Sequence, residues 1–166
     1  MSRTRKLATA ALLASLALVL HMAEAALPPL VAIPGIKLGL ANVVTLFAMV
    51  TLGIPCAAGV LAARIFVGGL LGGGLSAMLY GAAGGLASFA LMSLLCRKFQ
   101  RKRLWIVSAL CAVAHNYGQL AVAIAVTGRA EIIWYAPVLT AVGIIAGALT
   151  GVCATLVLNR LEKARK

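Results

Sequence analysis

Polar side chains able to bind a ligand lie inside stretches of sequence that are otherwise apolar. Arg64 stands near the middle of the apolar run 55–71. His115 and Gln119 are four residues apart and Asn116 and Gln119 are three apart, a spacing that places them on one face of a helix. A charge in the hydrocarbon core is costly unless it faces protein, water or a ligand. These residues are therefore candidates for a binding site.

Three more polar residues extend this candidate site. Lys37 precedes the second apolar stretch, Asn42 lies early within it, and Tyr80 lies early in the fourth. The set holds two cations, a histidine and several amide or hydroxyl groups, opposed by one nearby acid, Glu24. An excess of hydrogen-bond donors at low dielectric favours an anion. The sequence predicts a pocket for a small anionic substrate, with these contact residues: Lys37, Asn42, Arg64, Tyr80, His115, Asn116 and Gln119.

The same residues have a structural interpretation. Asn116 and Gln119 would then form hydrogen bonds between helices, and backbone carbonyls or Glu24 would neutralise Arg64. His21 and Glu24 are three residues apart, so we interpret them as a structural pair, with a proton relay as the alternative.

The composition requires a membrane around these polar residues. Of the 166 residues, 63% are hydrophobic and 11% charged, and the mean hydropathy is +1.08. A soluble protein of this size needs a larger polar surface. We expect a single domain over residues 1–166, an all-α membrane protein built as a bundle of six transmembrane helices. The expected spans lie at about 7–27, 38–53, 55–71, 75–96, 104–127 and 132–158.

The distribution of basic residues predicts the orientation of the bundle. Most of the net charge of +12 comes from three blocks, at 3–6, 97–103 and 163–166, each beside an apolar run. Basic loops stay in the cytoplasm, so both termini are predicted to be cytoplasmic, in a multi-pass protein of the cell membrane. The candidate site then lies in the outer half of the bundle. Blocks of this kind do not resemble a surface that binds nucleic acid, and we expect no nucleic-acid partner.

The first span has a competing interpretation as a cleaved signal peptide. Basic residues, an apolar segment and the small residues Ala23-Glu24-Ala25 follow one another in the order of such a peptide. Cleavage would leave five spans with the amino terminus outside. We expect the first span to be retained.

Glycines at four-residue intervals predict close helix packing. Gly143, Gly147 and Gly151 repeat in the last span, and Gly81 and Gly85 in the fourth. Small residues at this spacing let helix backbones approach each other in lipid. We expect contacts within the bundle, with a dimer interface as the alternative.

Several kinds of chemistry have no counterpart in the sequence. The four cysteines show no CxxC spacing, so we interpret them as packing residues rather than as a disulfide framework or zinc site. No GxxxxGK[ST] motif is present, so ATP hydrolysis would require partner subunits. We expect no catalytic activity, no cofactor and no metal in this chain.

Three segments and one further residue resemble a known family of membrane proteins. The segments PGIKLGLANVVTL (34–46), LYGAAGG (79–85) and HNYGQL (115–120), together with Arg64, resemble the Gx transporter family. That family is also described as heptaprenyl diphosphate synthase component I. It is similar in size and layout to the substrate-binding S components of energy-coupling-factor transporters.

The resemblance to S components implies a fold and partners. It implies six spans with both ends cytoplasmic and an outward-facing site closed by the loop 28–37. It also implies a small-residue face on the first helix, here Ala10 and Ala14, which would dock a transmembrane coupling subunit that works with ATPase subunits.

The leading functional hypothesis is a membrane transport component that captures a small anionic substrate from the outer face. An isoprenoid diphosphate, a quinone precursor and a flavin-related compound are the candidate substrates. One alternative is a non-transporting subunit or scaffold in quinone-dependent redox chemistry or prenyl diphosphate synthesis. A standalone channel or carrier is another. Catalysis of prenyl synthesis is not expected, because magnesium and diphosphate are held by paired aspartates and the chain contains no aspartate.

Overall fold

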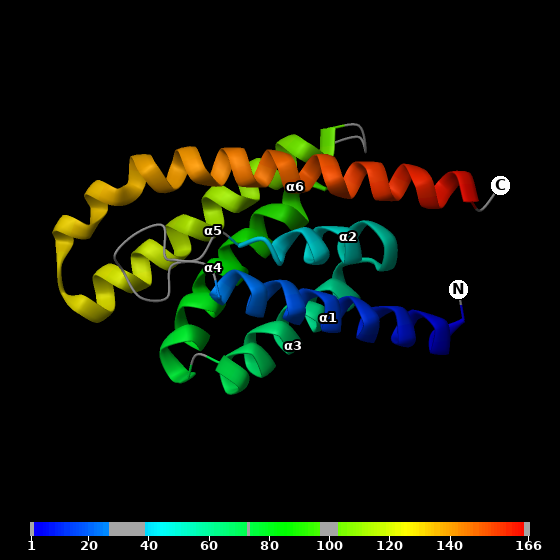
Figure 1. The fold of residues 1–166 in the computed structure, drawn as a ribbon, viewed down its shortest axis with the longest axis horizontal. Helices are drawn as coiled ribbons and strands as arrows, with labels where there is room; N and C mark the ends of the chain where they lie inside the picture. The colour runs from blue at the N-terminus through cyan, green and yellow to red at the C-terminus, as the bar shows by residue number, and fades with distance from the viewer. Residues whose placement is uncertain (1, 27–38, 73, 97–102, 165–166) are drawn as a thin grey trace.

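The computed structural model describes residues 2–26, 39–72, 74–96 and 103–164 (Figure 1). Within these ranges the chain forms six α-helices and one short 3-10 helix, with no strand. The all-α bundle predicted from hydropathy is confirmed. The elements in chain order are α1 (Arg3–Ala25), α2 (Asn42–Leu52), α3 (Ile54–Gly72), α4 (Gly74–Leu95), α5 (Leu104–Thr127), the 3-10 helix η2 (Ala130–Tyr135) and α6 (Ala136–Ala164).

Five segments in the described part of the chain are long and apolar enough to cross a membrane: α1, α3, α4, α5, and η2 together with α6. Their outward faces are apolar, as lipid requires. Leu7, Leu75 and Trp134 are 74%, 73% and 80% exposed. An aqueous surface would place polar groups at such positions. The chain is therefore a multi-pass membrane protein.

The helix α2 is shorter than the predicted span at 38–53. Its 11 residues rise about 16 Å, roughly half the thickness of the hydrocarbon core. Glycines with positive φ angles stand on both sides of it, Gly39 at 76° and Gly53 at 92°. Such angles interrupt an α-helix, which explains why α2 begins at Asn42 and ends at Leu52.

The two termini lie at the same end of the bundle (Figure 1). A recess at this end brings Arg5 of α1 together with Leu52 of α2 and Glu162 of α6. The connection between α5 and α6, which carries Arg129, lies at the opposite end. This arrangement agrees with the charge pattern, in which the basic amino and carboxyl ends share one side of the membrane.

Glycines of α6 pack directly against α5. A Cβ added at Gly147 would lie 2.6 Å from Ala109 Cα, and one added at Gly151 would lie 2.5 Å from Trp105 Cα. Such distances leave no room for a side chain. The predicted packing role of these glycines within the bundle is confirmed.

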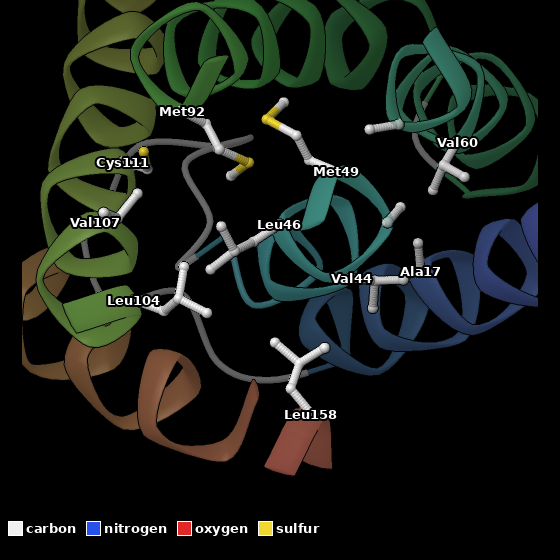
Figure 2. Packing of buried hydrophobic residues seen from close by; sticks show 12 residues of the cluster. Ala17, Val44, Leu46, Met49, Val60, Met92, Leu104, Val107, Cys111 and Leu158 are labelled. Carbon is white, nitrogen blue, oxygen red and sulfur yellow. The ribbon is translucent and has the colours of Figure 1, made fainter. Parts of the chain in front are cut away.

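Helix α2 runs through the centre of the apolar packing (Figure 2). Its Leu46 is 1% exposed and Met49 is 6% exposed. Side chains from every other α-helix surround it, and we call this cluster the inner core because it extends toward the end that holds the termini. Its buried members are Ala17, Val44, Leu46, Ala48, Met49, Ala57, Val60, Met92, Leu104, Val107, Cys111 and Leu158.

Candidate functional site

Four helices and the turn before α2 enclose a small cavity with polar walls, which we call the polar pocket. It lies where the end of α1 and the start of α2 meet α3, α4 and α5. Small residues of α4, among them Ala77 and Gly81, form one wall. The polar pocket's remaining lining includes His21, Glu24, Gly39, Arg64, His115 and Gln119.

Arg64 is the cationic centre of the polar pocket. Its side chain is 3% exposed, and its Nη1 donates a hydrogen bond of 2.9 Å to Asn42 Oδ1. Helix α4 comes close on the other side, because a Cβ added at Gly85 would lie 3.2 Å from Arg64 Nη2. A guanidinium has five N–H donors. The Asn42 bond fixes its orientation while using a single donor.

Glu24 connects the end of α1 to the start of α2. Its carboxylate accepts hydrogen bonds from the backbone N–H of Gly39 and, at 3.1 Å, from that of Leu40. It is 6% exposed and attracts the charge of Arg64. The acid therefore has two roles: it holds the start of α2 in place and it partly balances the buried cation.

His115 is held between two glycines. A Cβ added at Gly84 would lie 2.8 Å from His115 Nδ1, and one added at Gly39 would lie 2.9 Å from His115 Cδ2. The ring is 3% exposed. The backbone of Gly84 attracts the ring, yet Nδ1 makes no hydrogen bond of good geometry with the described residues. The ring therefore lines the polar pocket while its Nδ1 lies against Gly84 of α4.

Four of the predicted site residues come together. Arg64, His115 and Gln119 line the polar pocket, and Asn42 bonds to Arg64 at its edge. The Nδ2 of Asn42 has no partner among the described residues although the side chain is buried. It is a further donor beside the cation.

Two predicted site residues face elsewhere. Asn116 points to α6, where its Nδ2 donates a 2.8 Å hydrogen bond to the carbonyl of Leu139. The three residues predicted to share one face therefore meet different surroundings: His115 and Gln119 line the polar pocket, and Asn116 faces α6. Tyr80 packs in an apolar cluster with Leu120 and is not part of the lining.

The remaining predicted residues are Lys37 and the candidate docking residues Ala10 and Ala14. Lys37 and the loop 28–37 lie outside the described residues. Ala10 and Ala14 are partly buried and pack against the inner core. The exposed small residues of α1 include instead Ala8, Ala11, Ser15 and Ala23.

Two side chains of α1 belong to the polar pocket although the sequence suggested a structural role for them. His21 and Glu24 both line it. The signal was their position in the membrane span, where a histidine and an acid three residues apart are costly without a polar environment. Spacing alone did not reveal which face of α1 turns toward α3, so the sequence left them outside the site.

The polar pocket is closed in this structure. The space open to the centre of a water-sized sphere is about 10 Å³, enough for about one water molecule. A substrate larger than water requires the helices or side chains to separate. In the described ranges, no group of three His, Cys, Asp or Glu side chains could hold a metal ion.

Comparison with known families places the chain. The family model for heptaprenyl diphosphate synthase component I matches residues 13–157. The chain belongs to this family. No curated protein and no solved structure matches the chain.

The match supports the resemblance seen in the sequence and covers the whole polar pocket. Every lining residue, from His21 to Gln119, lies within the component I match, and so does Ala14, whereas Ala10 precedes it. The family is described as one component of a heptaprenyl diphosphate synthase.

The acids of this component I protein are widely separated. Glu24 lies in the polar pocket, whereas Glu131 follows α5 and Glu162 lies near the end of α6, at opposite ends of the bundle. A magnesium ion that binds a diphosphate also needs carboxylate oxygens gathered at one place. The described acids provide no such place.

Proposed function

We propose that this component I protein is a membrane transport component that binds a small anionic substrate from the side opposite the basic termini. The observation that carries the proposal is Arg64, a buried cation at membrane depth that uses one of its donors within the described residues. Its neighbours Asn42 and His115 each hold a buried nitrogen without a partner among the described residues. Together these groups supply charge and directional hydrogen bonds for anionic oxygens.

The polar groups of the polar pocket favour an anionic ligand. Glu24 offsets part of the charge on Arg64, and two backbone N–H groups already satisfy that carboxylate. A carboxylate or phosphate oxygen arriving beside Arg64 would meet donors that water otherwise has to satisfy. Lys37, which precedes α2 in the sequence, would add a second positive charge.

The chemistry of the family suggests the substrate class. An isoprenoid diphosphate fits both the family description and a cationic site in an apolar bundle, and a quinone precursor and a flavin-related compound are the other candidates. Because the sequence has no nucleotide-binding motif, active uptake would depend on ATPase partners. Docking of a coupling subunit would use α1, whose outer face is exposed.

Uptake into proteoliposomes tests the proposal. The probes are isotope-labelled isopentenyl diphosphate, farnesyl diphosphate and riboflavin, each offered to vesicles with the purified protein and to vesicles carrying the Arg64→Gln variant. Since ATPase partners are absent, the assay measures counterflow into vesicles preloaded with the same unlabelled probe. We expect one probe to enter faster with the parent protein than with Arg64→Gln. Equal rates for all three probes would contradict the substrate class.

A second candidate function follows from the word "component" in the family description. The protein would be a non-transporting membrane subunit that holds a prenyl-synthesising or quinone-dependent redox enzyme at the membrane. Purification in mild detergent separates the two candidates. ATPase subunits in the purified complex favour transport, and a prenyltransferase or redox enzyme favours the scaffold.

A further inference from the structure

Two buried hydroxyl groups below the polar pocket lack a hydrogen-bond partner among the described residues. Thr45 on α2 is 2% exposed and Ser88 on α4 is 1% exposed, and neither Oγ atom is bonded. An unpaired hydroxyl in an apolar interior lowers the stability of the fold. Such a group in a native structure requires an explanation.

Other hydroxyl groups in the helices donate hydrogen bonds to backbone carbonyls of their own helix. Each of five threonines donates to the carbonyl four residues earlier, at 2.7–2.8 Å: Thr9, Thr51, Thr127, Thr140 and Thr155. Ser93, on the same helix as Ser88, donates to the Ala90 carbonyl at 2.8 Å. Thr45 and Ser88 also follow helical carbonyls, but they do not make this bond. Both hydroxyls are therefore buried without a hydrogen bond in the described part of the chain.

On α2, Thr45 lies between the polar pocket and the inner core. Asn42, Thr45 and Met49 follow one another at intervals of three and four residues and so share one helix face. Asn42 reaches the polar pocket through its bond to Arg64. Met49 belongs to the inner core.

Helix α4 repeats this order. Gly85, Ser88 and Met92 have the same spacing and share a face. Gly85 lies against Arg64, and Met92 belongs to the inner core. Figure 2 shows the side chains of Met49 and Met92 extending toward the same region of the cluster. Each stripe thus begins beside Arg64, passes an unpaired hydroxyl and ends at a methionine of the inner core.

We propose that these stripes form the inner half of the substrate route, leading from the polar pocket between α2 and α4 toward the end that holds the termini. This inference rests on the proposed transport function. Thr45 and Ser88 bind water and the anionic oxygens of the substrate when the route is open. Met49 and Met92 close it. A methionine side chain is unbranched and has three rotatable bonds, so it can withdraw and return without a change in the backbone.

Cysteine accessibility tests the route without knowledge of the substrate. The four native cysteines are replaced by alanine, and Ser88→Cys is compared with Ala17→Cys, which is fully buried on α1 away from the route. Both variants are placed in lipid nanodiscs and treated with anionic sulfonatoethyl methanethiosulfonate, and intact mass follows the modification. Because only a thiolate in contact with water reacts, Ser88→Cys should react at least about tenfold faster than Ala17→Cys.

Equal, slow reaction of Ser88→Cys and Ala17→Cys would overturn the route. Thr45→Cys provides the same test from α2 if Ser88→Cys does not fold. Failure here is distinct from failure of the proposed function, since uptake that depends on Arg64 could persist with a different inner path.

Thermal unfolding of Ser88→Ala supplies an independent check. A hydroxyl that serves the open route makes no bond in the closed state, so its removal should leave the Tm at or above that of the parent. Ser93→Ala is the matched control, because it removes a hydroxyl that is bonded to the backbone. A larger fall in Tm for Ser88→Ala than for Ser93→Ala would show that the Ser88 hydroxyl stabilises the fold and would contradict the proposal.

Discussion

The polar pocket and the inner core are built on the same helices but by different physical means. In the inner core, Leu46, Val107 and Cys111 are at most 1% exposed and pack by shape and apolar contact. In the polar pocket, Arg64 and His115 are held by a directional hydrogen bond and by glycines that admit their side chains. The comparison assigns stability mainly to the inner core and selectivity to the polar pocket.

The cost of burial supports this assignment. A buried polar atom without a partner destabilises a fold, and such atoms occur in the polar pocket at Asn42 and His115. The buried members of the inner core are apolar side chains and one cysteine, so they carry no such cost. Departures from ideal packing that persist in a protein are expected at its functional site.

The largest effect on stability should come from the inner core. Leu46→Ala should lower the free energy of unfolding by about 2–5 kcal/mol, because it leaves a cavity at a fully enclosed site. Leu75→Ala, at a position that faces lipid, is the control and should change stability little. Unfolding in one detergent compares them. Equal free energies of unfolding for the two variants would contradict the assignment of stability to the inner core.

Gly84→Ala should have the next largest effect, because the new methyl group would meet the His115 carbonyl and imidazole at 2.8 Å. Overpacking of this kind costs about 1–3 kcal/mol and should also displace the ring. Gly59→Ala on α3 is the matched control, because Gly59 is exposed outside the polar pocket and a Cβ there meets nothing within 4 Å. A loss of both Tm and ligand affinity in Gly84→Ala, with neither lost in Gly59→Ala, is the expected result. Similar behaviour of both variants would be inconsistent with tight support of His115 by α4.

Two neighbours on α5 should behave oppositely. His115→Ala should weaken ligand binding by about 1–3 kcal/mol, since it removes a directional hydrogen bond. Asn116→Ala should instead lower the Tm and leave affinity unchanged, because its amide bonds to the Leu139 carbonyl of α6. Calorimetric binding and thermal unfolding are measured on the same samples. If Asn116→Ala lost affinity and kept its Tm, Asn116 would belong to the substrate site, as its spacing predicts.

Lys37→Gln should have the smallest effect. Its position before α2 predicts a solvent-facing charge at the mouth of the site, and exposed charges contribute at most about 1 kcal/mol. Salt should weaken the contribution further through screening. Affinity measured at low and high ionic strength should converge for Lys37→Gln and the parent as salt increases. A salt-independent deficit would place Lys37 inside the pocket.

The sequence predicted the all-α bundle correctly and identified Arg64 as a residue that must face the interior, for a physical reason. Long apolar stretches and a buried Arg64 are visible without coordinates, because lipid tolerates few charges and those few must face the interior. The helix that Asn116 faces could not be predicted in the same way. Neighbouring residues on a helix point about 100° apart, so small rotations decide which of them faces α4 and which faces α6.

The length of α2 and the rotation of α1 could not be predicted from sequence patterns either. Hydropathy continues smoothly through 38–53, but the positive φ angles of Gly39 and Gly53 limit α2 to 11 residues. His21 and Glu24 join the polar pocket because α1 turns that side toward its neighbours, a choice made by packing against α2 and α3. Patterns of spacing describe a helix face but not the partner that it meets.

Paired measurement of stability and binding in Arg64→Gln tests the central claim most directly. The ligand is whichever of the three uptake probes gives the largest thermal shift with the parent protein. The account predicts that a folded protein is recovered with an affinity at least about 100-fold weaker, since a buried charge contact is worth about 3 kcal/mol or more. A fall in Tm with unchanged affinity in the folded fraction would contradict it, and Arg64 would then be part of the bundle's internal bonding.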